Sequence, residues 1–464
     1  MTENVDLTLA NFIVNTDYSM IPQRVVEIAK KSLLDTLGVM LAGSTLGEGC
    51  KEFAKLAGEW GKGDCTVVGF GIKTSPPLAA FANGSMAHAL DYEEAHDGAL
   101  VHPSAQSLPT LFAISEAVGG ISGEDFIAAL ILGNELTVRL GLALACNPLE
   151  LGWYPPPILG GIGATAAGCK ILELSEREVL SALSLALCQT SCSAEIIHSP
   201  KSIIRAVRDA FPAMAGVTSV MLANNGITGF ERPITGNGGF FKMYADGNYQ
   251  PAVLTKDLGK TFEYADVSLK AWPSCRGTHS LIQAAIALVE ENPLKGEEIE
   301  NVHLVVGPVN RMLCEPLESK REPKTNIDAK FSLPFTVATA LVNKRVGLDS
   351  FFEEKLIDEE ILDLARRVTY EIKASYKPTE GLIAIKTKNG KVYSKRVNSN
   401  ELYGSPSNPL TEECLINKFI ECSKYSALRI NEDALKEVIE LVLNIEKVED
   451  VRAITSNLQA VKMP

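Results

Sequence analysis

Apolar residues recur at helical spacing along the first part of the chain. Between residues 22 and 42 they return every three to four positions, and residues 124–144 and 171–189 repeat the pattern with few charges. This period predicts helices that bury one face or their whole surface. Gly43 predicts the end of the helix at residues 22–42, because glycine commonly follows a helix C-terminus. We therefore predict that the chain begins with a helical domain.

The pattern changes after about residue 268. Strand-like runs at 303–306 and 368–372 are interspersed with helical patterns at 278–291 and 334–343. Residues 382–397 hold two alternating runs around Asn389-Gly390, which is a strong short-range signal for a β-hairpin. These features predict a region that mixes helices and strands.

Helical spacing returns from about residue 410, with Asn431 as a predicted N-cap. We predict a mainly α protein with a smaller α+β domain. Residues 1–267 would form a large helical domain, residues 268–405 an inserted α+β lid domain, and residues 406–464 a C-terminal return to the helical domain.

Composition narrows the classes of function. The 464 residues are 46% hydrophobic and 22% charged, with a net charge of −13, which argues against a nucleic-acid partner. The acidic N-terminus lacks the features of a signal peptide, and no uninterrupted apolar stretch approaches membrane-spanning length. The ten scattered cysteines form no Cys-x-x-Cys pair, so most are predicted to be reduced. We expect a cytoplasmic protein without a membrane partner.

Residues 88–102 concentrate histidines and carboxylates. The window contains His88, Asp91, Glu93, Glu94, His96, Asp97 and His102. Histidine titrates near neutral pH and a carboxylate can orient it, so an acid/base site is the favoured interpretation. A zinc site is an alternative, but the spacing matches no standard metal motif. The remaining alternative is a capped helix end followed by a polar loop. We predict no metal.

A basic segment precedes the predicted helix at 210–224. Lys201, Arg205 and Arg208 follow His198, and arginine can bind a carboxylate through two parallel hydrogen bonds. A negative substrate would fit such a segment even in an acidic protein. A solvated helix face is the alternative interpretation.

A second unusual segment runs from Lys270 to His279 and includes Trp272, Cys275 and Arg276. Cys275 lies near a predicted helix N-terminus, where a thiol pKa can fall and the residue can act as a base or nucleophile. Cys275 could equally be a packing residue.

Gly160-Gly161-Ile162-Gly163 looks like a fragment of a dinucleotide-binding motif. It follows Tyr154 and the run Pro155–Pro157, which cannot be the strand that such a motif requires. We predict instead a rigid loop that leads into a closely packed helix, and we predict no cofactor.

Taken together, several segments resemble the MmgE/PrpD family over essentially the whole chain. The matching segments are 35–38, 83–84, 87–92, 102–104, 226–229, 270–279 and 330–334. The resemblance implies a large helical domain, a smaller α+β lid, a homodimer and a cofactor-free site between the domains. It also implies chemistry that begins with proton removal next to a carboxylate.

Asp91, His102 and Lys270 match catalytic positions of the family. Other positions depart from it: Tyr154 and Arg208 replace histidines, Arg205 a lysine, Phe335 a tyrosine and Ala95 a threonine, while Cys275 is shared with epimerase-like members. We assign catalytic roles to His102, Asp91, Tyr154, Lys270 and Cys275, and substrate binding to Arg205, Arg208, Lys201, His96 and His279.

The resulting hypothesis is a cofactor-independent lyase of dehydratase or decarboxylase type that acts on a small anionic organic acid. An isomerase or epimerase that uses the same deprotonation is one alternative. A family member that binds a ligand without catalysis is the other. We further expect Tyr154 to change the chemistry rather than abolish it, with simple packing as the alternative, and Lys270 and Arg205 to bind the substrate together.

Overall fold

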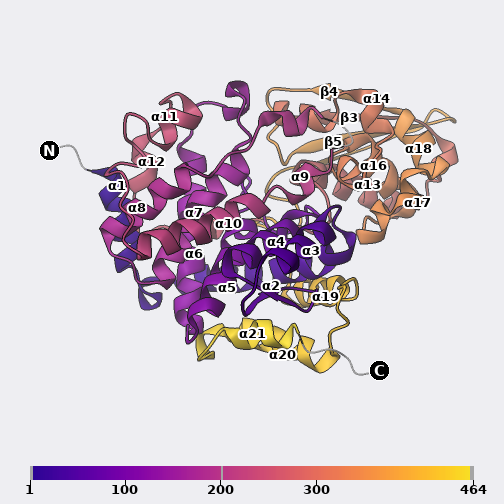
Figure 1. Ribbon diagram of the computed structural model, residues 1–464. Helices are drawn as coiled ribbons and strands as arrows, with labels where there is room; N and C mark the ends of the chain where they lie inside the picture. The colour runs from indigo at the N-terminus through magenta and orange to yellow at the C-terminus, as the bar shows by residue number, and fades with distance from the viewer. Residues whose placement is uncertain (1–3, 200–201, 460–464) are drawn as a thin grey trace.

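The computed structural model describes residues 4–199 and 202–459, which form a large helical body and a smaller α+β part (Figure 1). The helical body contains α1 (Val5–Asn15), α2 (Gln23–Leu46), α3 (Cys50–Trp60), α4 (Pro76–His88), α5 (Ser104–Val118), α6 (Gly123–Ala143), α7 (Pro155–Ile171), α8 (Glu176–Leu187), α9 (Ile204–Val207), α10 (Ala210–Asn224), α11 (Phe240–Ala245) and α12 (Pro251–Thr255). A two-stranded hairpin of β1 (Cys65–Val67) and β2 (Ile72–Thr74) lies between α3 and α4. The predicted mainly α fold is confirmed.

Close helix packing explains the glycine-rich run in α7. A Cβ atom added to Gly163 would lie 1.8 Å from Thr137 Oγ1 and 2.4 Å from the Gly133 carbonyl oxygen, both on α6. Only glycine lets the two helices approach this closely. Tyr154 is the N-cap of α7, and no strand leads into the helix. The run therefore serves packing, as predicted.

Helix α6 is long and apolar enough to cross a membrane by length and composition. However, 94% of its apolar window is buried inside the protein. This is the behaviour of a core helix, which a long apolar sequence alone does not distinguish from a membrane span.

The prediction that the helix at residues 22–42 ends at Gly43 is wrong. Helix α2 continues to Leu46, and Gly47 is its C-cap. A Cβ atom on Gly43 would lie 2.7 Å from the Met86 carbonyl oxygen of α4. Gly43 is thus a point of close contact between α2 and α4, which the sequence alone does not separate from a helix stop.

The smaller part combines helices with a four-stranded sheet. Its helices are α13 (His279–Glu291), α14 (Leu317–Arg321), α15 (Asn326–Lys330), α16 (Leu333–Asn343), α17 (Glu353–Leu356) and α18 (Glu359–Arg366). The strands β3 (Ile299–Val306), β4 (Val368–Ile372), β5 (Gly381–Thr387) and β6 (Val392–Val397) have the order β4-β3-β5-β6. Strands β3 and β4 are parallel and the other pairs antiparallel.

The predicted hairpin joins β5 and β6. The Thr387 amide donates to the Lys391 carbonyl oxygen (2.9 Å), and Gly390 adopts a φ of 86°. A glycine in this left-handed conformation is typical of a three-residue hairpin loop.

The chain then returns to the helical body through α19 (Glu412–Ser423), α20 (Glu432–Leu443) and α21 (Arg452–Asn457). In Figure 1, α19 lies beside α2, and α20 and α21, drawn in yellow, lie beneath α2 and α5. Helix α19 packs against α2, where Lys418 Nζ lies 2.6 Å from Asp35 Oδ1. Asn431 caps α20 as predicted. The numbered domain boundaries stay predictions.

Candidate active site

Five buried or half-buried side chains gather where α4 ends and α5 begins, and we call them the acid–base cluster: His88, Asp91, Glu93, His102 and Lys270. One ligand atom from each of the first four lies within 4.8 Å of the others. Lys270 lies close to these residues because Ser268, two positions before it, forms two backbone hydrogen bonds with Ala95, two positions after Glu93. The fold thus brings together the predicted residues Asp91, His102 and Lys270.

Asp91 and Lys270 form a fully buried ion pair. The Lys270 ammonium donates to the Asp91 carboxylate and, at 2.9 Å, to the Asp91 carbonyl oxygen. Burial alone would raise the pKa of Asp91, but the charge of Lys270 holds it well below the ordinary value. Asp91 also has a φ of 48°, a conformation that non-glycine residues seldom adopt outside functional sites and turns.

Glu93 joins the two histidines of the cluster through one oxygen atom. Its Oε1 lies 2.5 Å from His88 Nδ1 and 3.1 Å from His102 Nδ1. Burial opposes ionisation of Glu93, yet the charges of His88 and Lys270 keep its pKa well below the ordinary value. Burial lowers the pKa of His88. The sequence placed both residues in the right window but did not distinguish Glu93 from its acidic neighbours.

Backbone geometry fixes the tautomer of His102. Its Nδ1 lies 3.0 Å from the Glu94 carbonyl oxygen, which can only accept a hydrogen bond. Nδ1 therefore carries a proton, and Nε2 is the nitrogen left to exchange protons with a ligand. The His102 side chain is 15% exposed, whereas Glu93 beside it is fully buried.

The ligand types of the cluster would also suit a metal ion, and a candidate set of His88, Asp91, Glu93 and His102 meets the distance requirement. However, the Lys270 ammonium already neutralises Asp91, and one Glu93 oxygen already binds both histidines. This arrangement favours proton transfer. That the site works without metal stays a prediction.

Tyr154, Arg205, Arg208 and Phe331 form a second group, which we call the cationic cluster. Arg205 Nη2 lies 3.5 Å from the Tyr154 hydroxyl, and its guanidinium carbon lies 3.4 Å from the centroid of the Phe331 ring. Arg208 is paired with Asp209 (Nε to Oδ2, 3.5 Å). Within the described residues Arg205 has no carboxylate partner, although it is buried.

Cys275 does not have the predicted low pKa. Burial raises the pKa of its thiol to about 11, and the opposing charges of Lys270 and Arg205 do not compensate. The thiol is therefore protonated at neutral pH, which makes it a proton donor rather than a base or nucleophile. Both cations act on this one thiol, so Cys275 links the two clusters electrostatically.

His96 and His279 are each held by the protein itself. His96 Nδ1 accepts from the Ala99 amide (2.9 Å) and Nε2 donates to the Glu263 carbonyl oxygen (3.2 Å). His279 Nε2 donates to the Ser274 carbonyl oxygen (3.2 Å) and Nδ1 faces Arg276. Burial lowers the pKa values of both imidazoles. The neutral form fits these contacts, because one ring nitrogen of a neutral imidazole donates while the other accepts. The structure brings neither into the two clusters, and Lys201 lies outside the described residues.

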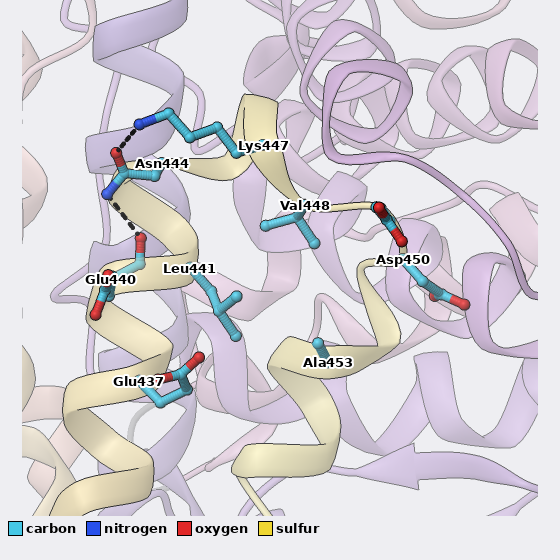
Figure 2. Close-up of a pocket in the computed structure, with 9 residues that line it drawn as sticks. Glu437, Glu440, Leu441, Asn444, Lys447, Val448, Asp450 and Ala453 are labelled. Carbon is cyan, nitrogen blue, oxygen red and sulfur yellow. Dashed lines mark hydrogen bonds between the residues drawn. The ribbon is translucent and has the colours of Figure 1, made fainter.

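One surface pocket of about 470 Å³ lies elsewhere, between α20 and α21 (Figure 2). Its lining includes Glu437, Glu440, Glu449 and Asp450, and none of the residues predicted from the sequence. These carboxylates would repel an anionic substrate, so we place the candidate site at the two clusters.

Fold and site together define a two-part, mainly helical protein with a buried cluster of acidic and basic side chains. The sequence matches the MmgE/PrpD N-terminal domain over residues 7–252 and the MmgE/PrpD C-terminal domain over residues 272–445. The chain therefore belongs to the MmgE/PrpD family.

Curated relatives agree with this assignment. The chain is 25% identical to human cis-aconitate decarboxylase, over 100% of this chain and 96% of the relative. It is 26% identical to cis-aconitate decarboxylase of Aspergillus terreus, with 96% and 94% covered. It is 28% identical to the cis-aconitate decarboxylase-like protein oryM of Aspergillus oryzae, with 79% of each chain covered. These relatives support a lyase of this general type.

Proposed function

We propose that the protein is a cofactor-independent lyase that removes a proton next to a carboxylate of a small organic acid. The resulting intermediate then either expels a neighbouring hydroxyl group as water, or takes up a proton at another carbon and loses CO₂. The observation that carries the proposal is the geometry of His102. Its Nδ1 proton is fixed by the Glu94 carbonyl oxygen, so Nε2 is free to take a proton from a substrate.

The other residues have complementary roles in this reaction. Proton removal next to a carboxylate builds negative charge on the substrate, and the Lys270 ammonium, which is paired with Asp91 in the same cluster as His102, would stabilise that charge. Arg205, which has no carboxylate partner among the described residues, would hold the substrate carboxylate. Tyr154 and protonated Cys275 are the candidate acids that return a proton.

An isomerase or epimerase is the second candidate function. It is favoured by Cys275, because a protonated thiol on a different segment from His102 could return the proton without loss of a leaving group. The two reactions share the first step and differ only in how the intermediate decays.

Proton NMR in D₂O separates these functions. Candidate di- and tricarboxylates are incubated with the wild-type enzyme and with His102→Gln. A lyase produces a new alkene or CO₂, whereas an isomerase incorporates deuterium without net loss of material. If no substrate exchanges or reacts but ligands still bind, the protein is a non-catalytic binder and the proposal fails.

The homodimer implied by the family resemblance and the cytoplasmic location stay predictions. Multi-angle light scattering of the purified protein tests the first, with twice the mass of one chain as the expected result.

A further inference from the structure

Lys418 of α19 contacts two segments of the candidate active site from a third part of the chain. Its ammonium donates to the Tyr92 carbonyl oxygen (2.7 Å) and to the Lys270 carbonyl oxygen (2.8 Å). Tyr92 directly follows Asp91, and Lys270 is the ion-pair partner of Asp91. Lys418 therefore binds the backbone beside both members of this pair, although it lies 326 residues after Tyr92 and 148 residues after Lys270.

The protein itself occupies all three N–H groups of the Lys418 ammonium. Besides the two carbonyl oxygens, Asp35 Oδ1 of α2 lies 2.6 Å from Nζ, and an ammonium has three donors. The Lys418 side chain is 6% exposed and that of Asp35 is fully buried. The ammonium also lies 3.6 Å from the centroid of the Tyr92 ring. Lys418 thus has no donor left for a substrate, and it acts on the site only through the residues that it holds.

The two carbonyl oxygens depend on Lys418. Within the described residues, neither the Tyr92 nor the Lys270 carbonyl oxygen accepts a hydrogen bond from another group. A buried carbonyl group without a donor is unfavourable, so loss of the ammonium would favour a shift of both segments. Asp91 lies in one of them with a φ of 48°, a conformation that persists only where the surrounding structure holds it.

We propose that Lys418 is a positioning residue for the acid–base cluster. By bridging the carbonyl oxygens of Tyr92 and Lys270, it sets the Lys270 ammonium against the Asp91 carboxylate. This inference rests on the proposed function in one respect, because the position of Lys270 affects turnover only if Lys270 stabilises the charge formed by proton removal. The competing role for Lys418 is to anchor α19 to α2 through Asp35 alone.

A pH titration of the imidazoles by NMR, without substrate, distinguishes these roles. His88 is the reporter, because its Nε2 lies 4.0 Å from Asp91 Oδ1, the atom that also pairs with Lys270. Its signal is assigned by comparison with His88→Gln. The test variant is Asp35→Asn/Lys418→Met, which removes both charges of the outer ion pair together and leaves the two carbonyl oxygens without their donor.

We expect the pH at which His88 is half protonated to rise by about 0.5 or more in this variant, because a less neutralised Asp91 favours the charged imidazole. Asp35→Asn/Lys418→Gln is a second, milder variant. Its shorter side chain cannot bridge both carbonyl oxygens but keeps a donor for one, so a smaller rise is expected. A His88 midpoint that is unchanged or lower in both variants overturns the proposal.

Two control variants separate positioning from anchoring. Asp35→Asn alone keeps Lys418 and its carbonyl contacts, so the His88 midpoint should not rise. Lys30→Met makes the lysine-to-methionine change at another buried lysine that ties α2 to the C-terminal segment, where Lys30 Nζ lies 2.8 Å from Glu446 Oε2. It should leave the midpoint unchanged. A rise in either control as large as in Asp35→Asn/Lys418→Met would assign the effect to anchoring and overturn the proposal.

Turnover is the second measurement, with the substrate that the NMR experiment in D₂O identifies. Asp35→Asn/Lys418→Met should lower kcat by about 10–100-fold and change KM by less than about threefold, because Lys270 acts on charge that develops only in the transition state. Lys30→Met should keep the wild-type kcat, and an equal loss there would contradict positioning. If the proposed function fails, no variant has turnover to compare, whereas the imidazole titration still decides the role of Lys418.

Discussion

The acid–base cluster and the cationic cluster are neighbours that balance their charges in opposite ways. In the acid–base cluster, Asp91 is neutralised by Lys270 and Glu93 is bound by two imidazoles, so the protein supplies both signs of charge itself. In the cationic cluster, Arg208 pairs with Asp209, but Arg205 contacts two aromatic rings and has no carboxylate partner within the described residues.

This difference separates two tasks. A cluster with internal pairs keeps its charges and geometry before a ligand arrives, which suits proton transfer. A cation that lacks a partner gains most when an anion binds, which suits substrate recognition. Substitutions of the charged residues should therefore differ: loss of a paired charge in the acid–base cluster should affect stability and turnover, whereas loss of Arg205 should affect mainly ligand binding.

The largest effect is expected for His102→Gln. Glutamine can still donate to the Glu94 carbonyl oxygen but cannot exchange a proton, so turnover should fall by about 10²–10⁴-fold. Thermal unfolding should stay close to wild type. His303→Gln is the matched control, since His303 lies on β3 and contacts Thr369. Undiminished turnover in His102→Gln would remove this residue from the mechanism.

Lys270→Met and Arg205→Met test the contrast in stability. Loss of Lys270 leaves Asp91 as a buried charge without its partner, so the free energy of unfolding should drop by about 3–5 kcal/mol. Arg205→Met should change it by less than about 1 kcal/mol, because no carboxylate loses its partner. Urea titrations measure both, and adding Asp91→Asn to Lys270→Met should recover part of the loss. Equal losses in the two single variants would contradict the comparison.

Tyr154→Phe examines whether the tyrosine hydroxyl serves chemistry or packing. The ring stays in place beside Arg208, and only the hydroxyl near Arg205 is removed. We expect turnover of Tyr154→Phe to fall by about 10–100-fold with stability nearly unchanged. Tyr154→His should change which products form rather than restore the wild-type products. Wild-type turnover in Tyr154→Phe would reduce Tyr154 to a packing residue.

The smallest effect is expected for Glu94. Its carboxylate accepts hydrogen bonds from the Ser104 amide (2.7 Å) and from the Thr36 hydroxyl (3.1 Å). Burial raises its pKa from 4.5 to about 7. The folded state therefore holds more protons than the unfolded state between these values, and stability falls as pH rises through that window.

Glu94→Gln removes this contribution. Relative to wild type, the variant should gain about 1–2 kcal/mol of stability between pH 5 and pH 8. Asp35, whose burial raises its pKa to about 6, remains and keeps a weaker dependence of the same sign. Urea unfolding at the two pH values checks this. An equal change in the free energy of unfolding of the wild type and of Glu94→Gln would show that Glu94 is not the responsible group.

Local sequence patterns determined much of this protein. Helical spacing located α2, α6, α13 and α16, and strand-like runs located β3 and β4, because periodic burial of apolar side chains is written directly into the order of residues. The departures of Tyr154 and Arg205 from the family pattern were also visible in the sequence. Gly43 shows the limit, since a helix stop and a close helix contact favour the same residue.

Only the tertiary structure assigned partners to the polar residues. Four carboxylates follow His88 within nine positions, and the sequence offered no means to rank them. The fold pairs Asp91 with Lys270, Glu93 with both histidines, Glu94 with the start of α5, and Asp97 with Arg276. Likewise, it places the Arg205 guanidinium over the Phe331 ring. The physical reason is that ionisation and hydrogen bonding depend on burial and on neighbours that are distant in the chain, and these are set only when the helices pack.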